Sequence, residues 1–129
     1  MTGMTIPTAE FKTRVTRLQA NLRASGLDAL LVHGNEADFA NVRYLTDYWP
    51  TFEAAAVFVP AVGRPVLLIG PESEQYAKAR SWVPRVLKMV EYRESADPEY
   101  PGIPVATYPD VVKAAMGGRR LRRLGIAGY

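Results

Sequence analysis

The chain has 129 residues, of which 48% are hydrophobic and 22% are charged, a balance that is typical of one folded globular domain. It contains no cysteine, which excludes a disulfide framework, a thiolate metal site and a cysteine nucleophile. The net charge of +3 is small, no apolar run is long enough to span a membrane, and the first residues lack the pattern of a signal peptide, so we expect a cytoplasmic protein without a membrane partner.

The first element that the sequence predicts is an amphipathic helix, which follows a flexible tail at residues 1–8. Four apolar residues recur at helical spacing, and these are Phe11, Val15, Leu18 and Leu22. Proline favours a first helical turn, so Pro7 is expected at the start of the helix, with Thr5 or Thr8 as its cap. Gly26 is expected to end the helix in a left-handed conformation, which glycine adopts without strain.

Two strands and a turn are predicted next. Residues 28–33 contain a continuous apolar run, which is typical of a buried strand. Residues 42–46 are rich in β-branched and aromatic side chains, and this composition predicts a second strand. Between them, residues 34–40 are expected to form a loop or a single helical turn that Asn35 caps.

A hairpin, a helix and a further strand follow. Residues 54–59 and 64–69 are predicted strands, and the four-residue link between them contains proline and glycine, which predicts an antiparallel hairpin. A turn that begins at Gly70 leads into a helix that runs to about residue 80. Residues 84–90 are then predicted to form another strand.

The last third of the chain begins with a proline-rich stretch at residues 93–107, which predicts a long irregular loop. Pro109 is expected to start a third helix that ends at Gly117, and residues 122–127 are expected to form the last strand. The order of these elements predicts an α/β domain, with a mixed sheet of about six strands and helices on both faces.

Three segments carry a resemblance to a known family. They are residues 26–32, 41–46 and 63–68, and the sharpest is Asn-x-x-Tyr-Leu-Thr at residues 41–46, followed by an aromatic pair. Over residues 9–129, their order and spacing resemble the N-terminal domain of the creatinase/prolidase/aminopeptidase P (M24 peptidase-like) family. The resemblance implies the same α/β architecture, with a ribonuclease H-like motif. Many relatives have glycine where this chain has Asp47, and aspartate also tolerates turn conformations.

The resemblance also implies a function that this chain would not perform alone. In the family, the catalytic groups and any divalent metal belong to a separate C-terminal domain, which is absent from this chain. The parent protein would be a C–N bond hydrolase, either a metal-dependent Xaa-Pro peptidase or a metal-free, creatinase-like enzyme that acts on a small amidine or amide. The chain would then be a non-catalytic N-terminal domain that contributes to a homo-oligomer, expected to be a dimer, and to the substrate entrance of a neighbouring subunit. The alternative is a free-standing binding or scaffold domain without any hydrolase domain.

The loop that follows the Asn-x-x-Tyr-Leu-Thr motif is the candidate functional site. Tyr48, Trp49 and Phe52 crowd this loop, and so much ring surface is costly to leave in water. The rings must therefore pack under the loop, meet another subunit or touch a ligand. By the family resemblance, we expect them to form, together with Arg43, part of a neighbouring subunit's substrate wall or part of the subunit interface.

No catalytic residue, metal site or cofactor is predicted within the chain itself. His33 is the only histidine, and no second ligand or orienting partner accompanies it at a suitable spacing, so we expect a structural role. Glu36 with Asp38, and Glu72 with Glu74, are two residues apart, which suits capping at the start of a helix better than metal binding.

Nucleic acid is not an expected partner either. Four arginines lie close together near the C-terminal end, and these are Arg119, Arg120, Arg122 and Arg123. Such a cluster would attract phosphates, but no aromatic residue that could stack on a base is interleaved with it. Cations are also favoured after the C-terminal end of a helix for purely local reasons.

Overall fold

The computed structural model describes residues 4–51, 53–94 and 102–128. In this part of the chain the helices are α1 (Thr8–Ala24), α2 (Ala40–Thr46), α3 (Glu74–Arg80) and α4 (Tyr108–Met116), with short 3₁₀ helices η1 (Pro71–Ser73) and η2 (Val90–Tyr92). The strands are β1 (Ala29–Gly34), β2 (Ala55–Pro60), β3 (Val66–Ile69), β4 (Val86–Lys88) and β5 (Leu124–Ala127). Phe52, residues 1–3 of the predicted tail and residues 95–101 of the predicted loop lie outside the described residues.

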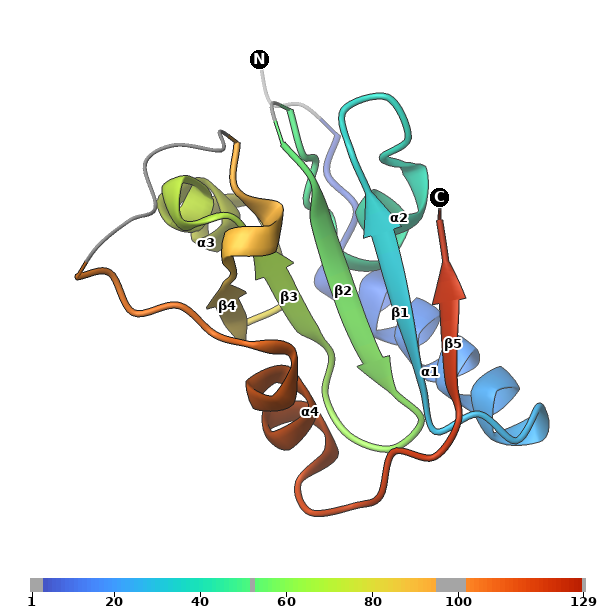
Figure 1. Ribbon diagram of the computed structural model, residues 1–129. Helices are drawn as coiled ribbons and strands as arrows, with labels where there is room; N and C mark the ends of the chain where they lie inside the picture. The colour runs from blue at the N-terminus through green and yellow to red at the C-terminus, as the bar shows by residue number, and fades with distance from the viewer. Residues whose placement is uncertain (1–3, 52, 95–101, 129) are drawn as a thin grey trace.

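The five strands form one mixed sheet in the order β4-β3-β2-β1-β5 (Figure 1). β2 is antiparallel to both β1 and β3, and the predicted hairpin is thereby confirmed. β4 is parallel to β3 and follows it through a crossover that contains α3, whereas β5, from the end of the chain, is parallel to β1. All residues of β2 and β3 are buried, as expected of central strands with helices on both faces.

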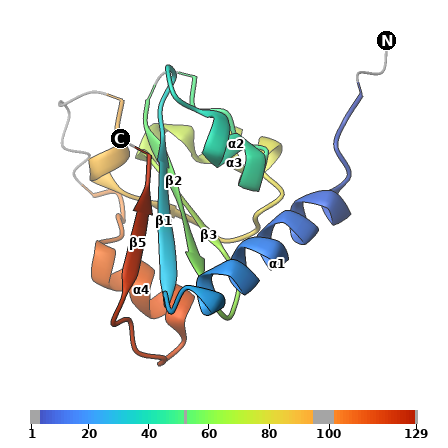
Figure 2. The ribbon, with the colours of Figure 1, turned by 90° about the vertical axis from the view of Figure 1, so that its right-hand side faces the viewer.

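Helices cover both faces of the sheet, as predicted, and each face has its own core. On one face α1, α2 and α3 pack against the sheet through a cluster that includes Val15, Leu45 and Ala77. On the other face α4 and η2 pack through a cluster that includes Val111 and Tyr92. Figure 2 shows this arrangement from the edge of the sheet, with α4 on the opposite side from α1 and α2.

The strand predicted for residues 42–46 is wrong, because these residues form most of helix α2. The buried residues of α2 are Val42, Leu45 and Thr46, whose spacing of three and four places them on one side of a helix. As a helix, the segment buries this side against β1 and β2, and this packing outweighs the strand preference of its β-branched and aromatic residues. The sheet therefore has five strands in the described residues, where about six were expected.

Several predicted ends of elements are confirmed, and one is not. Gly26 follows α1 with a φ of 71°, the left-handed conformation expected of it. The Asn35 side chain accepts hydrogen bonds from the backbone N–H groups of Ala37 and Asp38, so it caps the turn before α2. At the start of α1, however, Pro7 occupies the N-cap position and no side chain caps the helix.

Candidate functional site

Local hydrogen bonds at the end of helix α2 fix the path of the loop that carries the predicted site residues. The Thr46 hydroxyl donates to the Val42 carbonyl at 2.7 Å and accepts from the backbone N–H of Tyr48 at 3.0 Å. Between them, Asp47 is left-handed, with a φ of 62°, and its N–H donates to the Arg43 carbonyl at 2.9 Å. The chain therefore turns sharply at Asp47, in the way that an aspartate at a C-terminal cap allows.

This turn places Tyr48 inside the molecule. The residue is fully buried, and its hydroxyl donates to Glu53 Oε1 at 2.8 Å. The Ser73 hydroxyl donates to the same oxygen at 2.8 Å, and the ring of Tyr76 lies 5.4 Å from that of Tyr48. Burial, together with the adjacent Glu53 carboxylate, raises the pKa of the Tyr48 phenol. Tyr48 thus lies beneath the loop and joins it, through Glu53, to the segment before β2 and to Ser73 of η1.

Trp49, in contrast, lies at the surface and is 37% exposed. Its ring stacks on two neighbours from α2 and the turn before it. The Arg43 guanidinium carbon lies 4.9 Å from the Trp49 ring centroid, and the Phe39 ring lies 5.0 Å away at an angle of 35°. Among the described residues, no carboxylate forms an ion pair with Arg43. We call Phe39, Arg43 and Trp49 the aromatic–arginine patch.

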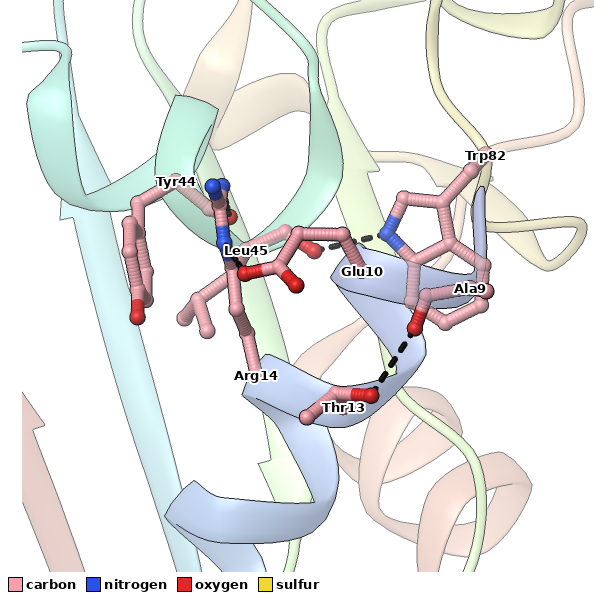
Figure 3. Close-up of polar contacts among 7 residues, drawn as sticks. All are labelled: Ala9, Glu10, Thr13, Arg14, Tyr44, Leu45 and Trp82. Carbon is pink, nitrogen blue, oxygen red and sulfur yellow. Dashed lines mark hydrogen bonds and ion pairs between the residues drawn. The ribbon is translucent and has the colours of Figure 1, made fainter. Parts of the chain in front are cut away.

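Next to the patch, Arg14 of α1 joins the two helices (Figure 3). Its Nη1 donates to the Tyr44 carbonyl at 2.9 Å, and its guanidinium carbon lies 4.3 Å from the Tyr44 ring centroid. Glu10 accepts from Arg14 Nε at 3.2 Å and orients it from the preceding turn of α1. Arg14, Arg43 and Tyr44 also line a shallow hollow of about 290 Å³ between the helices.

Trp82 holds the end of α2 from the other side. Its Nε1 donates to the Leu45 carbonyl at 2.7 Å, and its backbone N–H donates to the Thr46 carbonyl at 3.2 Å. These bonds satisfy two carbonyls at the C-terminal end of a short helix, which otherwise lack partners. Neither Arg14 nor Trp82 was a predicted site residue, because no local pattern indicates that they meet α2.

Two of the four predicted site residues are in contact with each other at the surface. Arg43 and Trp49 stack on each other, Tyr48 lies in the core, and Phe52 is outside the described residues. Phe39 completes the patch but was not predicted, because its contact with Trp49 depends on the turn at Asp47.

Outside the patch, His33 makes contacts within the fold. His33 Nε2 lies 3.0 Å from the Tyr92 hydroxyl, which is 2.6 Å from that of Tyr108. Burial lowers the pKa of the His33 imidazole. Among the described residues, no group of three or more histidine, aspartate or glutamate side chains is arranged to hold a metal ion.

The C-terminal arginine cluster is partly engaged by the fold. Arg119 donates to the carbonyls of Val62 and Ala115. The backbone N–H groups of Arg122 and Arg123 donate to Asp28 Oδ2 at 2.8 Å each, and these bonds lower the pKa of Asp28. The segment before β5 is thereby fixed to the start of β1.

None of the helices in the described residues has both the length and the apolar composition that a membrane span requires.

Comparison with known proteins connects this fold to one family. The family described as Creatinase/Prolidase N-terminal domain matches residues 14–128. Among curated proteins, none matches the chain.

Three solved structures illustrate the similarity. The N-terminal domain of the cytoplasmic peptidase PepQ from Mycobacterium tuberculosis H37Rv is 32% identical, with 57% of this chain and 53% of that chain covered and a TM-score of 0.50. The aminopeptidase P (Xaa-Pro aminopeptidase) from Streptococcus thermophilus is 25% identical, with 92% of each chain covered and a TM-score of 0.52. Dipeptidase PepE from Mycobacterium ulcerans is 19% identical, with a TM-score of 0.54 and 66% of this chain covered, and the match spans only 23% of that dipeptidase.

Proposed function

Because the chain belongs to the Creatinase/Prolidase N-terminal domain family, we propose that it is the non-catalytic N-terminal domain of a creatinase-, prolidase- or Xaa-Pro aminopeptidase-like hydrolase. In this role the domain contributes to oligomerisation, as one half of a dimer, and to the substrate entrance of the neighbouring subunit. The catalytic groups, and a divalent metal where the hydrolase uses one, belong to a separate domain. The substrate is a peptide, or a small amidine or amide, and the protein acts in the cytoplasm.

The aromatic–arginine patch is the observation that carries this proposal. Trp49 is 37% exposed although it is a large ring, and Arg43 has no carboxylate partner in the described residues. Tryptophan and arginine are enriched at the centres of protein interfaces, where a large ring fills a pocket and a guanidinium pairs with an acceptor. Both groups are thus available to another molecule.

The patch is also rigid before any partner arrives. Tyr48 holds the loop through Glu53, while Arg14 and Trp82 hold the end of α2. Trp49 is further fixed by its stacking on Arg43. Side chains that are already ordered lose less conformational entropy on binding, so the patch favours tight and specific contact.

The test uses the hydrolase that contains this domain, with Trp49→Ala and Arg43→Ala made separately. We expect Trp49→Ala to lower kcat/KM for a Xaa-Pro peptide by about tenfold, to weaken the dimer, or to do both. The dimer is followed by sedimentation velocity. Val62→Ala is the control, because Val62 is 51% exposed in the β2–β3 turn and is not part of the patch. Unchanged assembly and unchanged kcat/KM in both patch variants would refute the proposal.

A further inference from the structure

A second surface, separate from the aromatic–arginine patch, consists of two adjoining hollows between α1, the β2–β3 turn and the segment before β4. The first has a volume of about 510 Å³ and the second of about 460 Å³. Arg64, Pro65 and Pro84 line both hollows, so the two form one continuous depression. None of the residues of the aromatic–arginine patch lines either of them.

The charged residues of this depression all have the same sign. They come from four different elements, and they are Lys12, Arg64, Lys78 and Arg85. No aspartate or glutamate is among the described residues that line either hollow. Like charges held close together repel one another, and a bound anion relieves this repulsion. We call this surface the basic depression.

The four cations differ in how strongly the fold neutralises them. In the described part of the chain, neither Lys12 nor Arg64 has a carboxylate partner. Lys78 has a long, exposed pair with Glu74, at 3.7 Å, which contributes little in water. Arg85 donates to the Ala114 carbonyl, and this bond orients its guanidinium without neutralising its charge. Most of the positive charge is therefore available to a ligand.

The depression also has apolar walls between the cations. Trp82, which is partly buried, and Pro84, which is exposed, line the first hollow together with the buried residues Val15 and Pro65. The indole of Trp82 is held in place because its Nε1 donates to the Leu45 carbonyl. Apolar surface of this kind suits a hydrophobic side chain, and the surrounding cations suit carboxylates on either side of it.

We propose that the basic depression binds an acidic segment of a partner protein, in which carboxylates flank an apolar side chain. The apolar side chain lies against Trp82 and Pro84, and the carboxylates pair with Lys12, Arg64 and Arg85. A nucleic acid fits less well, because single-stranded nucleic acid binding uses several open aromatic rings for base stacking. Among the described residues that line the depression, Trp82 alone has an aromatic ring, and its indole is held in place by the Leu45 carbonyl. The binding would be salt-dependent, because it depends on exposed charges.

The test is fluorescence anisotropy with the purified chain and a labelled peptide that has two glutamates on each side of one leucine. We expect saturable binding that weakens when NaCl is raised from about 50 mM to about 200 mM. A peptide with serine in place of glutamate should not bind. Arg64→Glu should weaken binding by about tenfold, and Lys12→Glu, on a different element, should also weaken it.

The matched control is Arg120→Glu, which makes the same change in net charge at an exposed arginine outside both hollows. Binding to this variant should stay within about twofold of the unchanged chain. Equal losses in the Arg64 and Arg120 variants would mean attraction to net charge alone, and would overturn the proposal. So would the absence of peptide binding, or tighter binding of an oligothymidylate that depends on Arg64.

Discussion

The guanidinium of Arg14 lies over the ring of Tyr44 and also donates to the carbonyl of the same residue, at 2.9 Å. The side-chain contact and the backbone bond therefore join α1 to α2 at a single residue. The Tyr44 carbonyl, in a helix of only seven residues, thereby accepts a hydrogen bond from a charged donor. Arg14 also forms an ion pair with Glu10. The link between Arg14 and Tyr44 adds a contact with α1 to the packing of α2 on the sheet, and so helps to hold the aromatic–arginine patch in place.

Replacing Arg14 should therefore destabilise the fold more than replacing a neighbouring arginine. We expect Arg14→Ala to lower the free energy of unfolding by about 1–2 kcal/mol, through the loss of a charge-assisted hydrogen bond and a cation–π contact. Urea unfolding followed by circular dichroism measures this change. Arg17→Ala is the control, because the side chain of Arg17 is exposed on α1 and makes no hydrogen bond or ion pair with the described residues. Equal effects of the two substitutions would contradict the role given to Arg14.

The hydroxyl of Tyr48 offers a second test. Tyr48→Phe keeps the buried ring but removes the bond to Glu53, so we expect a loss of about 1 kcal/mol in the free energy of unfolding. The control Tyr76→Phe removes a hydroxyl from a ring that is 40% exposed, and it should have almost no effect. A Tyr48→Phe variant as stable as the unchanged chain would show that the hydroxyl does not hold the loop.

Tyr48 also predicts a change at high pH. The pKa of its phenol is raised in the folded chain, so the folded state favours the neutral form. The resulting stability is complete below the ordinary tyrosine pKa of about 10 and is lost as the pH rises above it. The decline above pH ~10 should be smaller in Tyr48→Phe than in Tyr76→Phe. Identical alkaline curves for these two variants would be inconsistent with a buried phenol.

The left-handed conformation of Asp47 should make stability depend on which residue occupies this position. Because its φ is 62°, Asp47→Gly should leave the free energy of unfolding unchanged or raise it by up to about 1 kcal/mol, while Asp47→Val should lower it by about 1–2 kcal/mol. Gly117 ends α4 with a φ of 57°, and Gly117→Ala is a matched comparison that should be destabilising by about 1 kcal/mol. Thermal unfolding of the four proteins measures these differences. A valine variant as stable as the glycine variant would contradict the left-handed turn.

His33 predicts the response to mild acid. Burial lowers its pKa in the folded chain, so the unfolded chain binds a proton at a higher pH than the folded chain does. The contribution of neutral His33 to stability is therefore complete above the ordinary pKa of about 6.5 and is lost as the pH falls through the lower, folded pKa. Urea midpoints measured between about pH 8 and pH 5 should fall less in His33→Gln than in the unchanged chain. The same slope in both proteins would exclude His33 as the cause.

Much of the fold could be predicted because the relevant signals are local. The stripe that begins at Phe11 predicts α1, since residues three and four apart share one face of a helix whatever surrounds it. Gly26 ends that helix, and the short link between residues 59 and 64 requires a hairpin, because both depend on backbone conformations within a few residues. The family resemblance also rests on short local motifs, and the family match confirms it.

Tertiary contacts decided the rest. Residues 42–46 have side chains that suit a strand, and only burial of Val42 and Leu45 against β1 and β2 makes them a helix. Tyr48 and Trp49 are adjacent aromatic residues that the sequence does not distinguish. In the structure they follow the left-handed turn at Asp47, and Tyr48 lies in the core while Trp49 lies at the surface. Composition and short-range spacing thus determined the class of fold and the segment that carries the patch. Which rings are exposed depended on packing between residues far apart in the chain, and a local pattern contains no information about such contacts.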